Sequence, residues 1–163
     1  MIVGMMGVGK TTLGVALADA LGLAYSDSDN DIFRLFGTSG AAIAAQYGVD
    51  QLHVIEAGLL YGALARSEPT VITAAASVVE REPVRVAVAN RARLVWVTAD
   101  LDETLLRQEA GRHRRQMSRE ELERLSERRR PLFEAMADVV IAADRHPDVL
   151  VQDVIDAFQE LQK

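Results

Sequence analysis

The sequence predicts an α/β fold in which a five-stranded parallel sheet lies between two layers of helices. Two observations predict it: short β-branched runs alternate with longer helical stretches, and a glycine-rich loop directly follows the first run. This alternation is typical of a sheet with helices on both faces. The 163 residues fit one domain, 1–163, which is large enough to bury its own core.

Five short apolar segments are the expected strands. They are rich in valine, isoleucine and threonine, which have high strand propensity. In chain order the expected strands are 1–4, 23–26, 70–73, 93–98 and 139–142.

Helices are expected between these strands. A helix from about Lys10 carries leucines at four-residue spacing, which is the period of one helix face. Residues 39–47 form a short helix that Gly48 ends, and Asp50 is the expected cap of a helix reaching about residue 66.

Two more helices are expected in the second half of the chain. Ser118 followed by Glu121 has the spacing of a capping box and opens a helix that runs toward residues 128–131. Pro147 or Asp148 starts a last amphipathic helix.

Composition limits the classes of protein to consider. The net charge of −6 argues against a general nucleic-acid or membrane-surface binder, and no apolar run approaches the length of a membrane-spanning helix. The chain has no cysteine, which excludes disulfides and a thiol nucleophile and fits a cytoplasmic protein. A signal peptide is not expected, because a phosphate-binding pattern begins at Gly4.

Residues 4–11, GMMGVGKT, match the phosphate-loop pattern G-x-x-x-x-G-K-[ST]. Such a loop turns successive backbone N–H groups toward an anion, and the following helix adds its positive N-terminal dipole. Lys10 is expected to reach the β- and γ-phosphates of ATP, and Thr11 to bind Mg²⁺. The other expected nucleotide-binding residues are Gly7, Val8, Gly9 and Thr12.

Lysine is otherwise nearly missing from the chain, since the second lysine is the terminal Lys163, whereas nine of the 18 basic residues are arginines within 107–130. A glycine-rich turn without a ligand is the alternative interpretation of the loop. A GTPase is not expected, because an N-K-x-D segment does not occur. The small size favours a metabolite or nucleoside kinase.

Asp27 and Asp29 lie two residues apart at the carboxyl end of the second expected strand, the edge at which such sheets bind ligands. One carboxylate could hold a water of the Mg²⁺ shell, and the other could grip or deprotonate an acceptor hydroxyl. Either aspartate could equally serve as a helix cap.

These motifs resemble the shikimate kinase family over nearly the whole chain. The phosphate loop and the D-x-D segment both match. A third stretch follows the family pattern G-x-S-I-x-x-I-F-x-x-x-G-E-x-x-F-R-x-x-E, with matches at Gly37, Ser39, Ile43, Gly48 and Glu56. Residues 129–133, RRPLF, resemble the family's R-x-P-L-Y segment.

The resemblance implies a P-loop kinase fold, ATP and Mg²⁺ as cofactors, and a small-molecule hydroxyl acceptor. It implies that Asp27 helps to hold Mg²⁺, that Asp29 binds the acceptor and is the catalytic base, and that Arg129 pairs with an acidic group of the acceptor.

The resemblance also implies residues around the nucleotide. Arg107 and Pro147 would flank the adenine. Arg114 would touch the γ-phosphate from a lid at about 109–118, with Arg112 or Arg115 as further candidates. A solvated helix face is the alternative for these lid arginines.

The departures from the family pattern fall on the acceptor side. His53 stands where the family has an arginine that clamps the shikimate carboxylate, and a neutral imidazole makes no two-pronged charged contact. An ordinary surface histidine is the alternative. Ala74, Ala75 and Ala76 stand in place of three glycines, and a Cβ in a left-handed backbone would cost about 1–2 kcal/mol. Leu52 replaces a phenylalanine.

The expectation is therefore a cytoplasmic kinase that binds ATP-Mg²⁺ ordinarily but phosphorylates shikimate poorly. Its acceptor site would include Asp29, His53, Ala75, Ala76 and Arg129. A gluconate- or cyclitol-type kinase and a catalytically idle ATP-binding protein are the alternatives. No nucleic-acid or membrane partner is expected, and the protein is expected to be a monomer or a weak homo-oligomer.

Overall fold

The computed structural model describes residues 1–110 and 117–161, apart from the side chains of residues 109 and 110. Five parallel strands form one sheet in the order β2-β3-β1-β4-β5. The strands are β1 (Ile2–Val3), β2 (Ala24–Asp27), β3 (Thr70–Thr73), β4 (Val95–Thr98) and β5 (Val139–Ala142). The predicted α/β fold with a five-stranded parallel sheet is confirmed.

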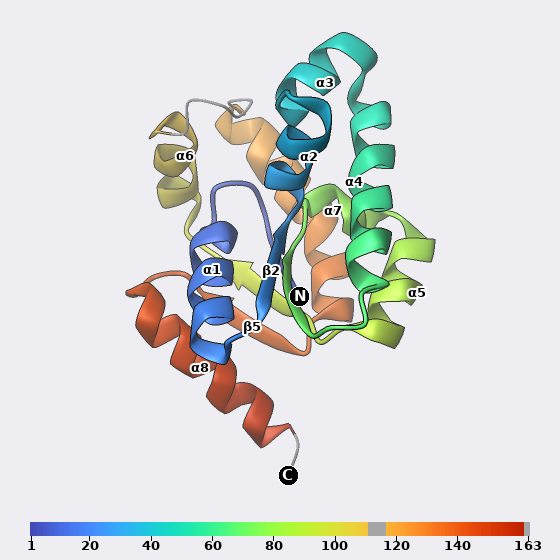
Figure 1. The fold of residues 1–163 in the computed structure, drawn as a ribbon. Coiled ribbons are helices and arrows are strands. Elements are labelled where there is room, and N and C mark those ends of the chain that lie inside the picture. The colour runs from blue at the N-terminus through green and yellow to red at the C-terminus, as the bar shows by residue number, and fades with distance from the viewer. Residues whose placement is uncertain (111–116, 162–163) are drawn as a thin grey trace.

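Helices cover both faces of this sheet (Figure 1). The helices α1 and α8 pack together on one face, whereas α4, α5 and α7 lie on the other. In chain order the helices are α1 (Lys10–Leu21), α2 (Ser28–Phe36), α3 (Gly40–Tyr47), α4 (Val49–Leu64), the 3₁₀ turn η1 (Ala76–Glu80), α5 (Glu82–Arg91), α6 (Leu101–Ala110), α7 (Arg119–Met136) and α8 (Pro147–Glu160). The segments α2, η1, α5 and α6 were not predicted.

Local capping signals explain several helix ends. The Ser118 hydroxyl accepts a hydrogen bond from the N–H of Glu121, and the Glu121 carboxylate accepts one from the N–H of Ser118, so the predicted capping box is confirmed. The prediction that Asp50 caps α4 is wrong. Gly48, with φ of 90°, both ends α3 and precedes α4, which leaves Asp50 in the first turn of α4.

The core lies on both sides of the sheet. The strands β1, β3 and β4 are largely buried, as expected for the centre of a parallel sheet. Phe133 of α7 is 1% exposed and stacks on Trp96 of β4, with ring centroids 5.6 Å apart. No helix within 1–110 and 117–161 is long and apolar enough to cross a membrane.

Candidate active site

The phosphate loop joins β1 to α1 at the carboxyl edge of the sheet, and two of its glycines permit its shape. Gly4 has φ of 151° and Gly7 has φ of 90°, which side chains with a Cβ rarely adopt. A Cβ on Gly4 would lie 2.3 Å from the carbonyl oxygen of Val97, and one on Gly7 would lie 2.9 Å from that of Thr104. The loop can therefore follow this tight path only with glycine at both positions.

Lys10 is the first residue of α1, and its side chain folds back over this loop. Its Nζ donates to the carbonyl oxygens of Gly4 at 3.0 Å and of Met5 at 2.9 Å. No side chain of the described residues caps the N-terminus of α1. The first backbone N–H groups of α1 and the Lys10 ammonium therefore share one region, as an anion-binding helix terminus requires.

Asp27, the last residue of β2, connects the phosphate loop to the next helix. Its Oδ1 accepts from the N–H groups of Asp29 and Asn30 and so caps α2, while its Oδ2 accepts from the Thr11 hydroxyl at 3.1 Å. The prediction that Asp27 caps a helix is confirmed, and its second carboxylate oxygen remains available to Thr11 and to the proposed role at Mg²⁺.

Tyr25 contacts Asp27 from the same strand, and it was not among the predicted site residues. Its hydroxyl donates to Asp27 Oδ2 at 3.0 Å and is hydrogen-bonded to the Thr73 hydroxyl, also at 3.0 Å. Burial and the negative charge of Asp27 raise the pKa of Tyr25, so the phenol stays protonated. Tyr25 and Thr73 come from neighbouring strands, and together they orient the carboxylate of Asp27.

Thr11 and Asp27 offer a hydroxyl and a carboxylate oxygen 3.1 Å apart. Mg²⁺ prefers oxygen ligands and is commonly held by one or two protein groups together with substrate phosphates and water. This donor set fits Mg²⁺ bound with a nucleotide. A cluster of three or more metal-binding side chains does not occur among the described residues, so a stand-alone protein site is not offered.

A cavity of about 170 Å³ opens beside the phosphate loop, between β3, α4 and α7. It brings together eight of the predicted site residues: Lys10, Thr11, Asp27, Asp29, His53, Ala75, Ala76 and Arg129. We call this cavity the acceptor pocket.

Arg129 is the buried cation of the acceptor pocket. It is 7% exposed, and its Nε donates to Glu80 Oε1 at 2.8 Å; Arg128 Nη2 donates to the same oxygen at 2.6 Å. Burial alone would raise the pKa of Glu80, but the hydrogen bonds from Arg129 and Arg128 lower it below its ordinary value. Glu80, which the sequence analysis missed, therefore remains a carboxylate and holds Arg129 through one edge of its guanidinium.

His53 lines the same pocket from α4. Its burial, followed by the nearby positive charge of Arg129, lowers its pKa. A histidine with a lowered pKa is neutral at pH 7. In the part of the chain that the structure describes, the pocket thus has one buried guanidinium and a neutral imidazole.

Glu56 is a second buried acid of the pocket. It is 8% exposed and accepts a hydrogen bond from the hydroxyl of buried Ser77. Burial raises the pKa of Glu56, although the bond from Ser77 opposes the shift. Glu56 was predicted only as a match to the family pattern, and Ser77 was not predicted, because their contact joins α4 to η1.

The backbone of residues 74–76 corrects one expectation. Ala75 has φ of −60° and ψ of 146°, and no described residue other than glycine has a positive φ. The expected cost of a Cβ in a left-handed conformation is therefore not incurred. The alanines differ from glycines here by the space that their methyl groups occupy.

Arg107 joins α6 to the phosphate loop and to the end of β5. Its guanidinium donates to the carbonyl oxygens of Val8 at 3.3 Å and Ala143 at 3.2 Å, and to Glu103 at 3.0 Å. Pro147, its expected partner at the adenine, starts α8 shortly after Ala143.

Buried Gln108, also missed, donates to the carbonyl oxygen of Met6 at 3.1 Å and so fixes the other side of the phosphate loop. Arg112, Arg114 and Arg115 lie outside the described residues, as does most of the expected lid.

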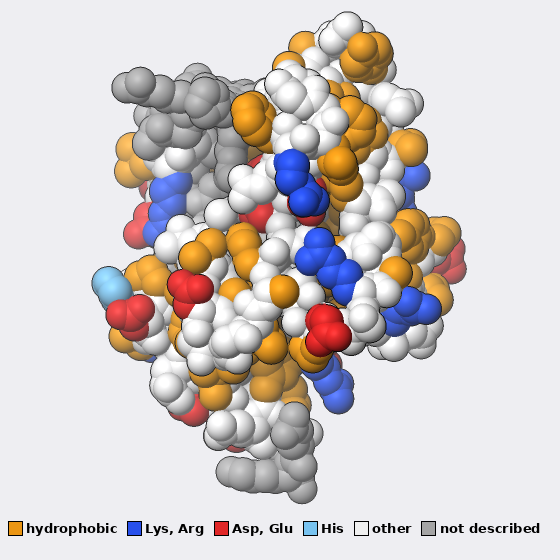
Figure 2. Space-filling model, viewed as in Figure 1, with side chains coloured by type: hydrophobic (Ala, Val, Ile, Leu, Met, Phe, Trp, Pro, Cys, Tyr) orange, Lys and Arg blue, Asp and Glu red, His pale blue; other side chains and the backbone are white. Residues whose placement is uncertain are grey.

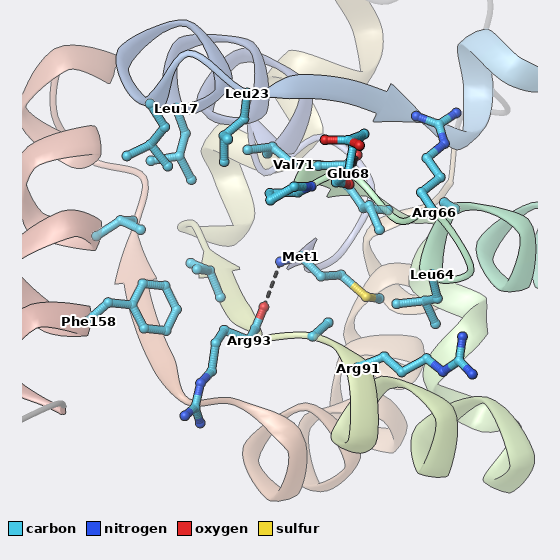
Figure 3. Close-up of a pocket in the computed structure, with 18 of the residues that line it drawn as sticks. Met1, Leu17, Leu23, Leu64, Arg66, Glu68, Val71, Arg91, Arg93 and Phe158 are labelled. Carbon is cyan, nitrogen blue, oxygen red and sulfur yellow. Dashed lines mark hydrogen bonds between the residues drawn. The ribbon is translucent and has the colours of Figure 1, made fainter.

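A second cavity, of about 590 Å³, lies at the opposite edge of the sheet (Figure 3). Leu17, Leu64, Val71 and Phe158 line it, with Arg66 at its rim. None of the predicted site residues that the structure describes lines it. Ligands of open parallel sheets bind at the carboxyl ends of the strands, so the acceptor pocket is the candidate site.

A glycine-lined phosphate loop, a lysine at the start of α1 and a partly open pocket with acidic groups define the class: a P-loop kinase of small molecules. Comparison with known proteins identifies the family. The shikimate kinase family model matches residues 6–159, and the chain belongs to this family.

Two bacterial relatives illustrate the similarity. A shikimate kinase of Streptomyces avermitilis is 32% identical over 162 residues, which cover 97% of this chain and 94% of the relative. One from Pseudoalteromonas translucida is 30% identical over 159 residues, covering 94% and 92%.

Solved structures agree with this assignment. A shikimate kinase from Acinetobacter baumannii in complex with shikimate matches with a TM-score of 0.87 at 26% identity, over 98% of this chain and 91% of that one. A gluconokinase from Sinorhizobium meliloti has a TM-score of 0.63 at 18% identity over 98% and 91%, which is a likeness of fold alone. The chain is thus an ATP-dependent small-molecule kinase.

Proposed function

We propose that this protein transfers the γ-phosphate of ATP, bound with Mg²⁺, to a hydroxyl group of shikimate or a closely related hydroxy acid. One observation carries the proposal: Asp29 and buried Arg129 line the same small pocket as Lys10 and Thr11 of the phosphate loop. An acceptor in this pocket has its hydroxyl near the nucleotide and its acidic group near a guanidinium. The similarity of the chain to bacterial shikimate kinases supports shikimate as the acceptor.

Each residue then has a physical role. The loop N–H groups and Lys10 hold the phosphates, and Thr11 and Asp27 supply the protein ligands for Mg²⁺, which neutralises developing charge when bound. Asp29 accepts the proton of the acceptor hydroxyl. Tyr25 and Thr73 keep the carboxylate of Asp27 in place through the hydrogen bonds described above.

We further propose a nucleotide side in which Arg107 and Pro147 flank the adenine. Arg114 completes it from the lid at 109–118, where exclusion of water would limit wasteful hydrolysis. The working form is proposed to be one domain, as a monomer or weak homo-oligomer in the cytoplasm, where ATP is available and a chain without cysteine needs no oxidising compartment.

The finer proposal is that shikimate binds weakly. Arg129 is the pocket's one described arginine, and neutral His53 supplies no second charged contact. A hydrogen bond to a charged group is worth about 1.5–3 kcal/mol, so its loss raises KM by about 10- to 100-fold.

A coupled ATPase assay with shikimate tests both levels of the proposal. We expect measurable phosphorylation by the natural protein and a lower KM in His53→Arg. Val54→Arg is the matched control, because it adds the same charge to the exposed side of α4. A KM that His53→Arg leaves unchanged would remove the finer proposal.

Phosphorylation of gluconate or a cyclitol in place of shikimate would establish the alternative acceptor class. ATP binding without turnover on any of these compounds would indicate an idle homologue.

A further inference from the structure

The acceptor pocket adjoins a larger hollow between α2, α3 and the start of α4. This hollow, which we call the α3 groove, measures about 920 Å³. Met6, Asp29 and Glu56 line both spaces, so the two adjoin. Small-molecule sites usually occupy about 300–1,000 Å³, whereas the acceptor pocket alone has about 170 Å³.

The groove is mainly apolar, and Asn30 and Ser39 are its uncharged polar residues. Its α3 and α4 wall consists of Gly40, Ala41, Ala44, Ala45, Val49 and Leu52. Phe33 of α2, which is 64% exposed, forms the opposite side. Hydrophobic side chains gather over this part of the molecule (Figure 2).

Charge is confined to the end that meets the acceptor pocket. Among the described residues, the charged side chains of the groove are Asp29 and Glu56, and both of them also line the acceptor pocket. A ligand that spans both spaces would therefore place polar groups near Asp29 and an uncharged apolar group between α2 and α3.

The shikimate kinase family pattern has larger residues along this wall than the present chain has. Gly40 stands at its isoleucine, and Ala44 and Leu52 stand at its two phenylalanines. The side chain of Leu52 packs against Gly40, since a Cβ on that glycine would lie 3.2 Å from Leu52 Cδ1. Little open space therefore remains at Gly40 itself. The open space is therefore created chiefly at Ala44 and its neighbours.

We propose that the α3 groove is a specificity subsite for an acceptor that carries an apolar substituent, such as an aryl or branched alkyl group. The proposal rests on the proposed function, because the phosphorylated hydroxyl lies at Asp29 in both. The groove binds the substituent by burying its apolar surface, which for a group the size of a phenyl ring is worth about 10- to 100-fold in affinity.

The test compares shikimate with its mono-O-benzyl ethers in the coupled assay and by calorimetry in the presence of a non-hydrolysable ATP analogue. We expect at least one benzyl ether to have a KM about tenfold or more below that of shikimate. Ala44→Phe fills the groove and should reverse this preference. Ala42→Phe is the matched control, since Ala42 lies on the same helix, is exposed and does not line the groove.

A second filling variant, Ala45→Phe, guards against misfolding of the first, because Ala45 is exposed and lines the same groove. The proposal is overturned if shikimate is phosphorylated while no benzyl ether binds better. It is equally overturned if the Ala42 and Ala44 variants change the preference alike, or if sedimentation shows that a second copy of the chain covers the groove. Failure of every acceptor would instead count against the proposed function.

Discussion

Replacing Glu80 by alanine tests the claim that Arg129 is the anchor for an acidic acceptor. Glu80 accepts hydrogen bonds from Arg129 and Arg128 on one carboxylate oxygen. The side chain of Arg129 is 8% exposed, whereas that of Arg128 is 64% exposed. Removal of Glu80 therefore leaves a buried guanidinium without this partner.

The expected loss of stability follows from this burial. Breaking a fully buried pair costs about 3–5 kcal/mol. The Glu80 side chain is 26% exposed, so water partly compensates and the loss should be about 1–3 kcal/mol. Arg128→Gln is the matched control, because it removes the exposed pair on the same oxygen, which is worth at most about 1 kcal/mol.

The same substitution should impair acceptor binding. Glu80 contacts Arg129 through Nε, which leaves the two terminal nitrogens outside this contact and orients them. Glu80→Ala should raise the KM for shikimate about tenfold with a smaller change in kcat. This corresponds to a loss of about 1.4 kcal/mol of binding free energy when Arg129 is no longer held in position.

Urea unfolding and steady-state kinetics measure the two effects. Because the pKa of Glu80 is lowered, its contribution is present above the unfolded pKa, near 4.5, and is lost as the pH falls through the folded value. The difference between the natural protein and the alanine variant should shrink accordingly below pH 4.5. A KM for shikimate that falls in Glu80→Ala, or equal destabilisation by Arg128→Gln, would refute the reasoning.

Three further outcomes follow from the site. Lys10→Ala should reduce phosphoryl transfer by roughly 100- to 1,000-fold or more in the coupled assay, because it removes a charge beside the transferred group. Gly14→Ala should lower the free energy of unfolding by about 1–3 kcal/mol, since its Cβ would lie 2.5 Å from Thr73 Oγ1, whereas Gly58→Ala, with open space, should not. Glu56→Gln should be more stable than the natural protein at pH 7. Because the pKa of Glu56 is raised in the folded state, its charged form destabilises the fold as the pH rises above 4.5. The stability advantage of the glutamine variant should therefore vanish below that pH. Urea unfolding at both pH values checks the last two.

Features that depend on neighbouring residues could be predicted from the sequence. The phosphate loop needs glycine at fixed positions and a lysine at the helix start, and the structure has Gly4, Gly7 and Lys10 in those places. The capping box of α7 is likewise a four-residue signal. The strands emerged because short β-branched runs between helices are typical of a parallel sheet.

Features that depend on distant residues could not be predicted in this way. Tyr25 and Thr73 meet because β2 and β3 are neighbours in the sheet, and no local pattern pairs them. The contact between Glu80 and Arg129 spans 49 positions. Both contacts involve a residue that holds a predicted site residue, so the sequence predicted candidate site residues but not the groups that contact them.

The predicted departures from the family pattern differ between the two sides of the acceptor pocket. On the β3 side, Ala75 and Ala76 add methyl groups where the pattern has glycine, without straining the backbone. On the α3 side, Ala44 stands where the pattern has a phenylalanine and lines the α3 groove. These predicted differences favour an acceptor that extends toward α3, which simple loss of an acceptor site would not produce. Because the phosphate loop and Asp29 lie where the two spaces meet, we expect phosphoryl transfer to shikimate or a related hydroxy acid to be kept, with tighter binding of acceptors that carry a substituent toward α3.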